Sequence, residues 1–137
     1  TRAEKAIANH VTGGDQLKHV LLNVHLQTRA KIASAPGVMD IYHRALNTRT
    51  EAVERHRAFL IQTCAGIIEF GIERGEFKIE RAQIPAALIL IELATRKFTH
   101  PVLISEGLAD DTPAEAESVL TFFINAIRSA PSLFPNS

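Results

Sequence analysis

Two segments of this 137-residue chain are apolar on more than one face of the helix that each would form. Between residues 84 and 93 the only polar residue is Glu92, and between residues 119 and 127 only Thr121 and Asn125 are polar. A helix at the surface of a globular protein normally shows one apolar stripe. Both helices must therefore be covered on two sides. They could form the centre of a monomeric core, but we favour a second copy of the chain, giving an intermolecular four-helix bundle with two-fold symmetry.

Composition and charge limit the class of protein. With 46% hydrophobic and 22% charged residues, the chain can bury the core of one globular domain. Its 15 basic and 15 acidic residues cancel, whereas a domain that binds DNA by itself normally carries a basic excess. The single cysteine, Cys64, excludes an internal disulfide and favours a reducing cytoplasm. The longest apolar stretch, residues 84–94, is shorter than the ~20 residues of a membrane helix.

Helical spacing and capping signals divide the first part of the chain. Residues 1–11 have the spacing of the end of a helix, and because the chain opens without a methionine we expect that helix to begin upstream, in a longer protein. After two glycines, Asp15 predicts the N-cap of a helix over residues 15–34. The Ala-Pro-Gly break at residues 35–37 ends it, and a short helix is expected over residues 38–46.

The longest predicted helix follows. The capping box Thr48-Arg49-Thr50-Glu51 predicts its start, and it ends near residue 74, where Gly75 suits a left-handed C-cap. The next helix is expected over residues 81–98, with Pro85 in its first turn, where the missing N–H costs nothing.

Beyond that helix we expect a loop over residues 100–111. Thr112 as cap, followed by a proline and a glutamate, then predicts a helix over residues 112–129. Residues 131–137 are expected to be a flexible tail. Because no alternating strand pattern occurs, the sequence predicts an all-α fold, a bundle of about five or six helices.

The order of these pieces resembles the C-terminal region of regulators of the tetracycline-repressor (TetR) family. The resemblance is carried by the segment Gly71-Ile72-Glu73-Arg74-Gly75-Glu76-Phe77, the proline-bearing apolar helix after it, the His100-Pro101 loop and the final apolar helix. It covers nearly the whole chain as a pattern of helices.

The resemblance implies a division of the chain and a function. Residues 1–12 would end the helix that connects to an absent N-terminal helix-turn-helix domain, and residues 13–130 would form a ligand-binding and dimerisation domain. In such a regulator, expected to be a repressor, a small apolar or aromatic effector changes the separation of the two recognition helices. Operator DNA would then be contacted only through the missing domain. The alternatives are a dimeric helical scaffold domain that binds no small molecule and a small helical-bundle enzyme.

A pocket among the middle helices is what the resemblance implies for the ligand. Polar residues that interrupt apolar stripes are the candidates to line it, with two apolar wall residues. A solvated or core position remains an equal alternative for each of these residues: His25, Thr28, Arg29, Tyr42, Gln62, Thr63, Phe59 and Ile67.

Glu92 is the most informative single candidate, because an unpaired carboxylate in an apolar run is costly to bury. Arg96 lies four residues later, a spacing that favours an ion pair. We favour a structural pair and keep open a pocket group that binds the polar head of a ligand. His100 could cap the end of that helix.

The dimer seam is expected on the two apolar helices. Rows at helical spacing supply the candidates. They are Leu88, Ile91 and Thr95, then Ile89, Glu92 and Arg96, and on the final helix Val119, Phe122, Phe123, Ala126 and Ile127.

Other chemistry finds little support in the sequence. None of the six histidines is paired at the i, i+4 spacing of metal ligands, so we predict no metal site and no cofactor. Cys64 lies in an apolar stripe, where a thiol is usually a small core residue. There is no glycine-flanked serine and no glycine-rich phosphate loop, so we do not expect an enzyme.

Overall fold

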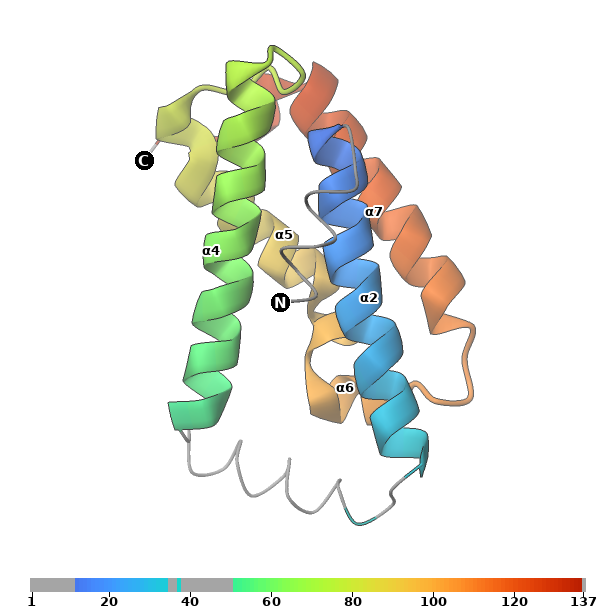
Figure 1. The fold of residues 1–137 in the computed structure, drawn as a ribbon. Helices are drawn as coiled ribbons and strands as arrows, with labels where there is room; N and C mark the ends of the chain where they lie inside the picture. The colour runs from blue at the N-terminus through green and yellow to red at the C-terminus, as the bar shows by residue number, and fades with distance from the viewer. Residues whose placement is uncertain (1–11, 35–36, 38–50, 137) are drawn as a thin grey trace.

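The computed structural model describes residues 12–34, 37 and 51–136 (Figure 1). These residues form helices and turns and contain no strand, which confirms the all-α fold class. The expected short helix with Tyr42, the connecting helix and Thr48 of the capping box lie outside them. The helices are α2 (Gly13–Ser34), α4 (Glu51–Glu73), α5 (Ile84–Thr99), α6 (Pro101–Glu106) and α7 (Thr112–Ser129), with 3-10 turns η1 (Arg81–Gln83) and η2 (Pro131–Leu133).

Helix α2 is the centre of the bundle. It packs against α4, α5, α6 and α7, and α5 also packs against α4 and α7 (Figure 1). Aliphatic side chains between these helices are fully buried, among them Leu17, Ile68, Leu120 and Ile127. Among the described residues, no helix combines the length and apolar character needed to cross a membrane.

The start of α2 differs from the sequence prediction. Thr12, not Asp15, is the N-cap: its hydroxyl accepts from the Asp15 amide at 3.0 Å, and its carbonyl accepts from the Gln16 amide. The amides of Gly13 and Gly14 donate to the carboxylate of Glu76, at 2.7 and 3.0 Å. All four amides of the first turn are therefore satisfied, two of them by a side chain more than sixty residues away in the chain.

The turn after α4 confirms the C-cap prediction. Gly75 has φ of 75°, a conformation that side chains with a Cβ rarely adopt. The amides of Glu76 and Phe77 then donate to the carbonyl of Gly71, which folds the chain back on the helix end. The Phe77 ring is buried against Gly71, where any Cβ would collide with it. The segment that carries the family resemblance is thus a tightly packed turn.

Two predictions in the second half need correction. The expected loop over residues 100–111 contains the short helix α6, with Pro101 in its first turn. The bounds of α7 agree with the prediction, but its N-cap is Asp111, not Thr112, and the hydroxyl of Thr112 is engaged by His25 and Arg29.

The expected flexible tail also differs, at Phe134. Its ring is buried and meets Phe123 edge-on, with centroids 5.9 Å apart. The Gln83 side chain donates to the carbonyl of Pro131 at 2.8 Å, which holds η2 against the start of α5. Burial of the Phe134 ring in the core holds this segment in place, although its composition is that of a loop.

Candidate ligand pocket

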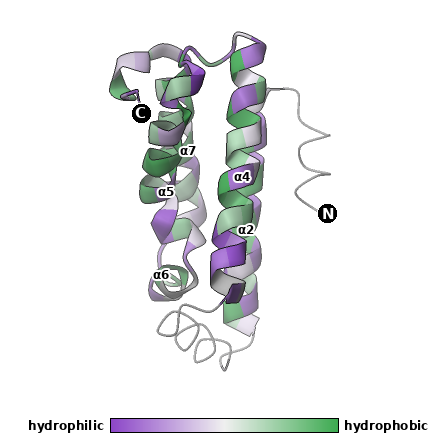
Figure 2. Cartoon of the chain, turned by 90° about the vertical axis from the view of Figure 1, so that its left-hand side faces the viewer, coloured by the Kyte–Doolittle hydropathy of each residue, from purple (hydrophilic) through white to green (hydrophobic). Residues whose placement is uncertain are grey.

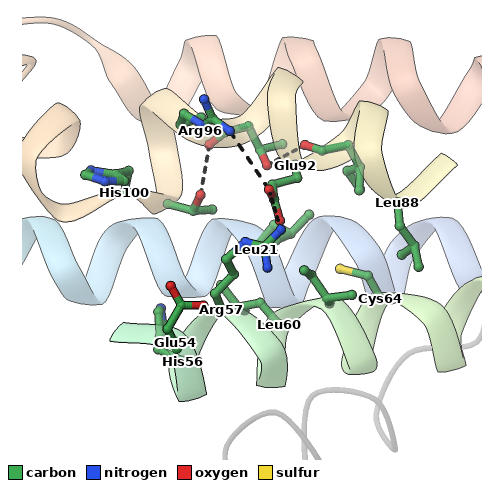
Figure 3. Close-up of a pocket in the computed structure, with 14 residues that line it drawn as sticks. Leu21, Glu54, His56, Arg57, Leu60, Cys64, Leu88, Glu92, Arg96 and His100 are labelled. Carbon is green, nitrogen blue, oxygen red and sulfur yellow. Dashed lines mark hydrogen bonds and ion pairs between the residues drawn. The ribbon is translucent and has the colours of Figure 1, made fainter. Parts of the chain in front are cut away.

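A pocket of about 540 Å³ opens between α2, α4 and α5 (Figure 3). Its volume lies within the range of roughly 300–1,000 Å³ that is usual for small-molecule sites. It is lined by Leu21 from α2, by Glu54, His56, Arg57, Leu60, Ile61 and Cys64 from α4, and by Leu88, Ile91, Glu92, Thr95, Arg96, Thr99 and His100 from α5 and its end.

One part of the pocket is apolar. Leu60 and Cys64 of α4 face Leu88 of α5 across it (Figure 3), and Ile91 of α5 also lines it. Burial raises the pKa of the Cys64 thiol to about 12, so the sulfur stays protonated and forms part of a neutral wall. This part can bind a hydrocarbon or aromatic body by excluding water.

The polar part centres on Glu92. Arg57 of α4 donates to its carboxylate oxygen Oε1 at 3.1 Å, and Arg96 of α5 lies 3.9 Å from the same oxygen. The Arg57 and Arg96 side chains are 57% and 52% exposed, so both guanidinium groups remain in reach of a solute. Exposed pairs of this kind contribute at most about 1 kcal/mol to stability.

His100 closes the polar end. Burial lowers its pKa, the charge of Arg96 lowers it further and Glu106 raises it in part, which together favour the neutral ring. Its Nδ1 atom is buried and has no hydrogen-bond partner among the described residues. His100 is the C-cap residue of α5, as expected, and its backbone N–H donates to the carbonyl of Arg96. It is also the N-cap of α6, where its side chain makes no cap bond.

The predicted ligand residues are only partly brought together. Glu92 and Arg96 line the pocket, whereas Ile67 is in the core and Phe59 and Gln62 are exposed. The Thr63 hydroxyl donates to the carbonyl of Phe59 on its own helix. Neither these residues nor Thr28 lines the pocket, and Tyr42 lies outside the described residues.

His25 and Arg29 belong to a buried network instead. Nδ1 of His25 lies 3.0 Å from the Phe98 carbonyl, which can only accept, so Nδ1 carries the proton. Nε2 accepts from the Thr112 hydroxyl at 2.8 Å, whose oxygen accepts from Arg29. Burial lowers the pKa of His25. The hydrogen bond to the Phe98 carbonyl raises this pKa in part, and the charge of Arg29 lowers it further. Arg29 also donates to the carbonyls of Leu108 and Asp110, so the network ties α2 to the loop before α7.

The residues of the predicted interface rows lie in four different settings. Leu88, Ile91, Glu92 and Thr95 line the pocket, and Phe123 and Ile127 are buried in the subunit's own core. Ile89 on α5 and Phe122 on α7 are exposed, and so is Leu93, which the prediction omitted and which follows Ile89 by four residues on α5. Val119 and Ala126 are partly buried.

Sequence reasoning predicted that α4 lines the pocket but named residues on the wrong face of the helix. Arg57, Leu60, Ile61 and Cys64 have the i, i+3, i+4, i+7 spacing of one helix face, and all four line the pocket. The spacing can be recognised in the sequence, but it does not indicate whether this face of α4 borders a cavity or packed core.

No group of three or more His, Cys, Asp or Glu side chains placed to hold a metal ion occurs in the described part of the chain.

The fold and the pocket define an all-α domain with a cavity of small-molecule size between three helices. Residues 14–120 match the family of tetracycline-repressor-like C-terminal domains, and the chain belongs to this family. This confirms the resemblance, and domains of this family are regulatory rather than enzymatic. Searches of curated proteins and of solved structures gave no match.

Proposed function

We propose that this chain is the ligand-sensing and dimerisation domain of a cytoplasmic transcriptional repressor. A small molecule with an apolar or aromatic body binds in the pocket between α2, α4 and α5 and changes the affinity of an upstream DNA-binding domain for its operator. The observation that carries this proposal is the pocket itself, a cavity of about 540 Å³ with an apolar part and a charged part in a domain of a regulatory family.

The position of the pocket supports a signalling role. Its walls include α2, the helix that follows the chain's N-terminal segment, and α5, which packs against α7. A ligand can shift a conformational equilibrium only by as much as it prefers one state. A molecule wedged between α4 and α5 acts on the spacing of these elements, and α2 passes the change toward the N-terminus.

Binding is tested by thermal shift and calorimetry with a panel of small apolar and aromatic compounds. A compound that binds only the folded state raises the melting temperature of the protein. At a concentration one hundred times its Kd, such a compound stabilises the folded state by about 2.7 kcal/mol. Leu60→Trp, which fills the apolar part, should abolish the shift, while Gln62→Trp on the exposed side of α4 should keep it. Shifts unchanged by Leu60→Trp would place the ligand elsewhere.

The dimer is supported by the outer face of α5 and α7. Phe122 is 76% exposed, and Ile89 and Leu93 are 61% and 55% exposed. Figure 2 shows α5 and α7 side by side, with hydrophobic segments on both. Large apolar side chains that remain exposed on two helices packed against each other favour an interface with a partner.

Adjacent phenylalanines provide the test of the dimer. Phe122→Glu should give folded monomers in light scattering, because it puts a charge on the exposed face. Phe123→Glu should instead unfold the subunit, because Phe123 is only 5% exposed and packs against Phe134. Gln62→Glu on α4 is the control and should leave the dimer intact. A wild-type protein that scatters as a 15.1 kDa monomer at micromolar concentration would refute the interface.

A further inference from the structure

The charged part of the pocket has more hydrogen-bond donors than acceptors. Arg57 and Arg96 both approach one carboxylate oxygen of Glu92, at 3.1 and 3.9 Å. Each guanidinium has five N–H donors, and one carboxylate cannot satisfy two such groups. The hydroxyl protons of Thr95 and Thr99 are used within α5, on the carbonyls of Ile91 and Thr95.

Glu54 is the other acidic residue on the wall, and it makes no ion pair with a described residue. It lies three residues before Arg57 on the same helix, so it lowers the positive potential at the pocket without occupying either guanidinium. Glu54 therefore offers a control of opposite sign: its removal should favour an anion and disfavour a cation.

His100 adds an independent sign of an unfilled polar position. Its buried Nδ1 lacks a partner among the described residues, and leaving a buried polar atom without a hydrogen bond is unfavourable. The atom belongs to a residue that lines the pocket beside Arg96 and Thr99. A polar ligand atom, directly or through one water, would satisfy it.

Resting on the function proposed above, we propose that the pocket binds an amphipathic monoanion whose carboxylate lies between Arg57 and Arg96. Two arginines, Glu92 and the ligand carboxylate then form a cluster of two cations and two anions in alternating order. Guanidinium groups bind carboxylates with paired, charge-assisted hydrogen bonds. The apolar body of the ligand extends toward Leu88 and Cys64, away from His100 (Figure 3).

The test compares three probes that share one apolar body, namely octanoate, octanol and octylamine. Calorimetry on the wild-type protein should rank octanoate first, by about tenfold or more over both others, the effect expected of one charge-assisted contact. Acetate, a carboxylate without the body, should not bind measurably.

Matched variants assign the effect to the arginines. Arg57→Gln and Arg96→Gln should each weaken octanoate by about tenfold and leave octanol unchanged, and Arg57→Lys should fall between because it keeps the charge but loses the fork. Glu54→Gln should leave octanoate binding equal or tighter. These side chains are largely exposed, and circular dichroism verifies that each variant is folded.

The outcomes separate this inference from the proposed function. Octanol or octylamine binding as tightly as octanoate would overturn the anion proposal while leaving a small-molecule sensor intact. The anion proposal would also be overturned if octanoate bound Arg57→Gln and Arg96→Gln as tightly as the wild type. If none of the three probes binds, this ligand class is rejected, and the broader compound panel alone decides whether the pocket is a sensor site.

Discussion

Two glutamates, Glu76 and Glu92, meet arginines in different ways. Glu76 accepts from the amides of Gly13 and Gly14 and from Arg128, all at 2.7–3.1 Å, and its side chain is 16% exposed. Glu92 uses one oxygen, 3.1 Å from Arg57, and the second arginine stays at 3.9 Å. The first cluster joins α2, the α4–α5 turn and α7, and the second borders the pocket.

The difference lies in how fully each carboxylate is satisfied. Burial alone would raise the pKa of Glu76, but the hydrogen bonds from Arg128 and the two glycine amides, with the charge of Arg128, lower it overall. A group held in its ionised form by so many donors fixes structure. A loosely paired group at a cavity can exchange partners at little cost. Under the proposed function, the Glu76 cluster is structural and the Glu92 cluster is the one that responds to a ligand.

The largest expected effect is at Glu76. Glu76→Gln removes the charge that Arg128 and the start of α2 share and brings an amide N–H against backbone N–H groups. It should lower the free energy of unfolding by about 2–3 kcal/mol. Urea denaturation measures this, and Glu117→Gln, whose residue is exposed and 4.0 Å from Lys18, is the matched control with little expected change. Equal losses in both variants would contradict the structural role.

Acid should act through the same residue. Because the pKa of Glu76 is lower in the folded state, its contribution is complete above the unfolded value of about 4.3 and is lost as pH falls through the lower folded value. The wild type should therefore lose stability below about pH 4.3 more steeply than Glu76→Gln. Denaturation midpoints measured between neutral pH and about pH 3 test this. Parallel curves for the two proteins would show that Glu76 is not the group that titrates.

The smallest effect is expected at the pocket. Glu92→Gln should change the free energy of unfolding by less than about 1 kcal/mol, because Arg57 and Arg96 keep access to solvent. Both variants are measured in the same urea series. If Glu92→Gln lowered the free energy of unfolding as much as Glu76→Gln, both clusters would be structural.

Local signals in the sequence predicted much of the fold. The bounds of α7 follow from Pro113 and the acidic first turn, and the left-handed C-cap follows from Gly75. Pro85 lies in the first turn of α5, as its missing N–H requires. Each of these features depends on residues within one helical turn, so it can be predicted from the local sequence.

The remaining features depend on distant partners. Nothing near Asp15 reveals that Glu76 serves the start of α2, and nothing near Thr112 reveals that His25 occupies its hydroxyl. The pocket face of α4 looks like a core face, because a cavity is defined by what three helices leave unfilled. Of the predicted ligand residues, Glu92 and Arg96 are the two that line the pocket, and a charge pair interrupting an apolar run is visible locally.

The way α2 begins affects the order in which the domain can fold. The acceptor for the Gly13 and Gly14 amides is synthesised more than sixty residues after them, and Arg128, which orients that acceptor, comes later still. A nascent chain that ends before the α4–α5 turn therefore has a first turn of α2 held only by Thr12. Such long-range closure slows folding and makes it cooperative. In pulsed hydrogen exchange, the Gly13 and Gly14 amides should gain protection together with α7, after the middle of their own helix.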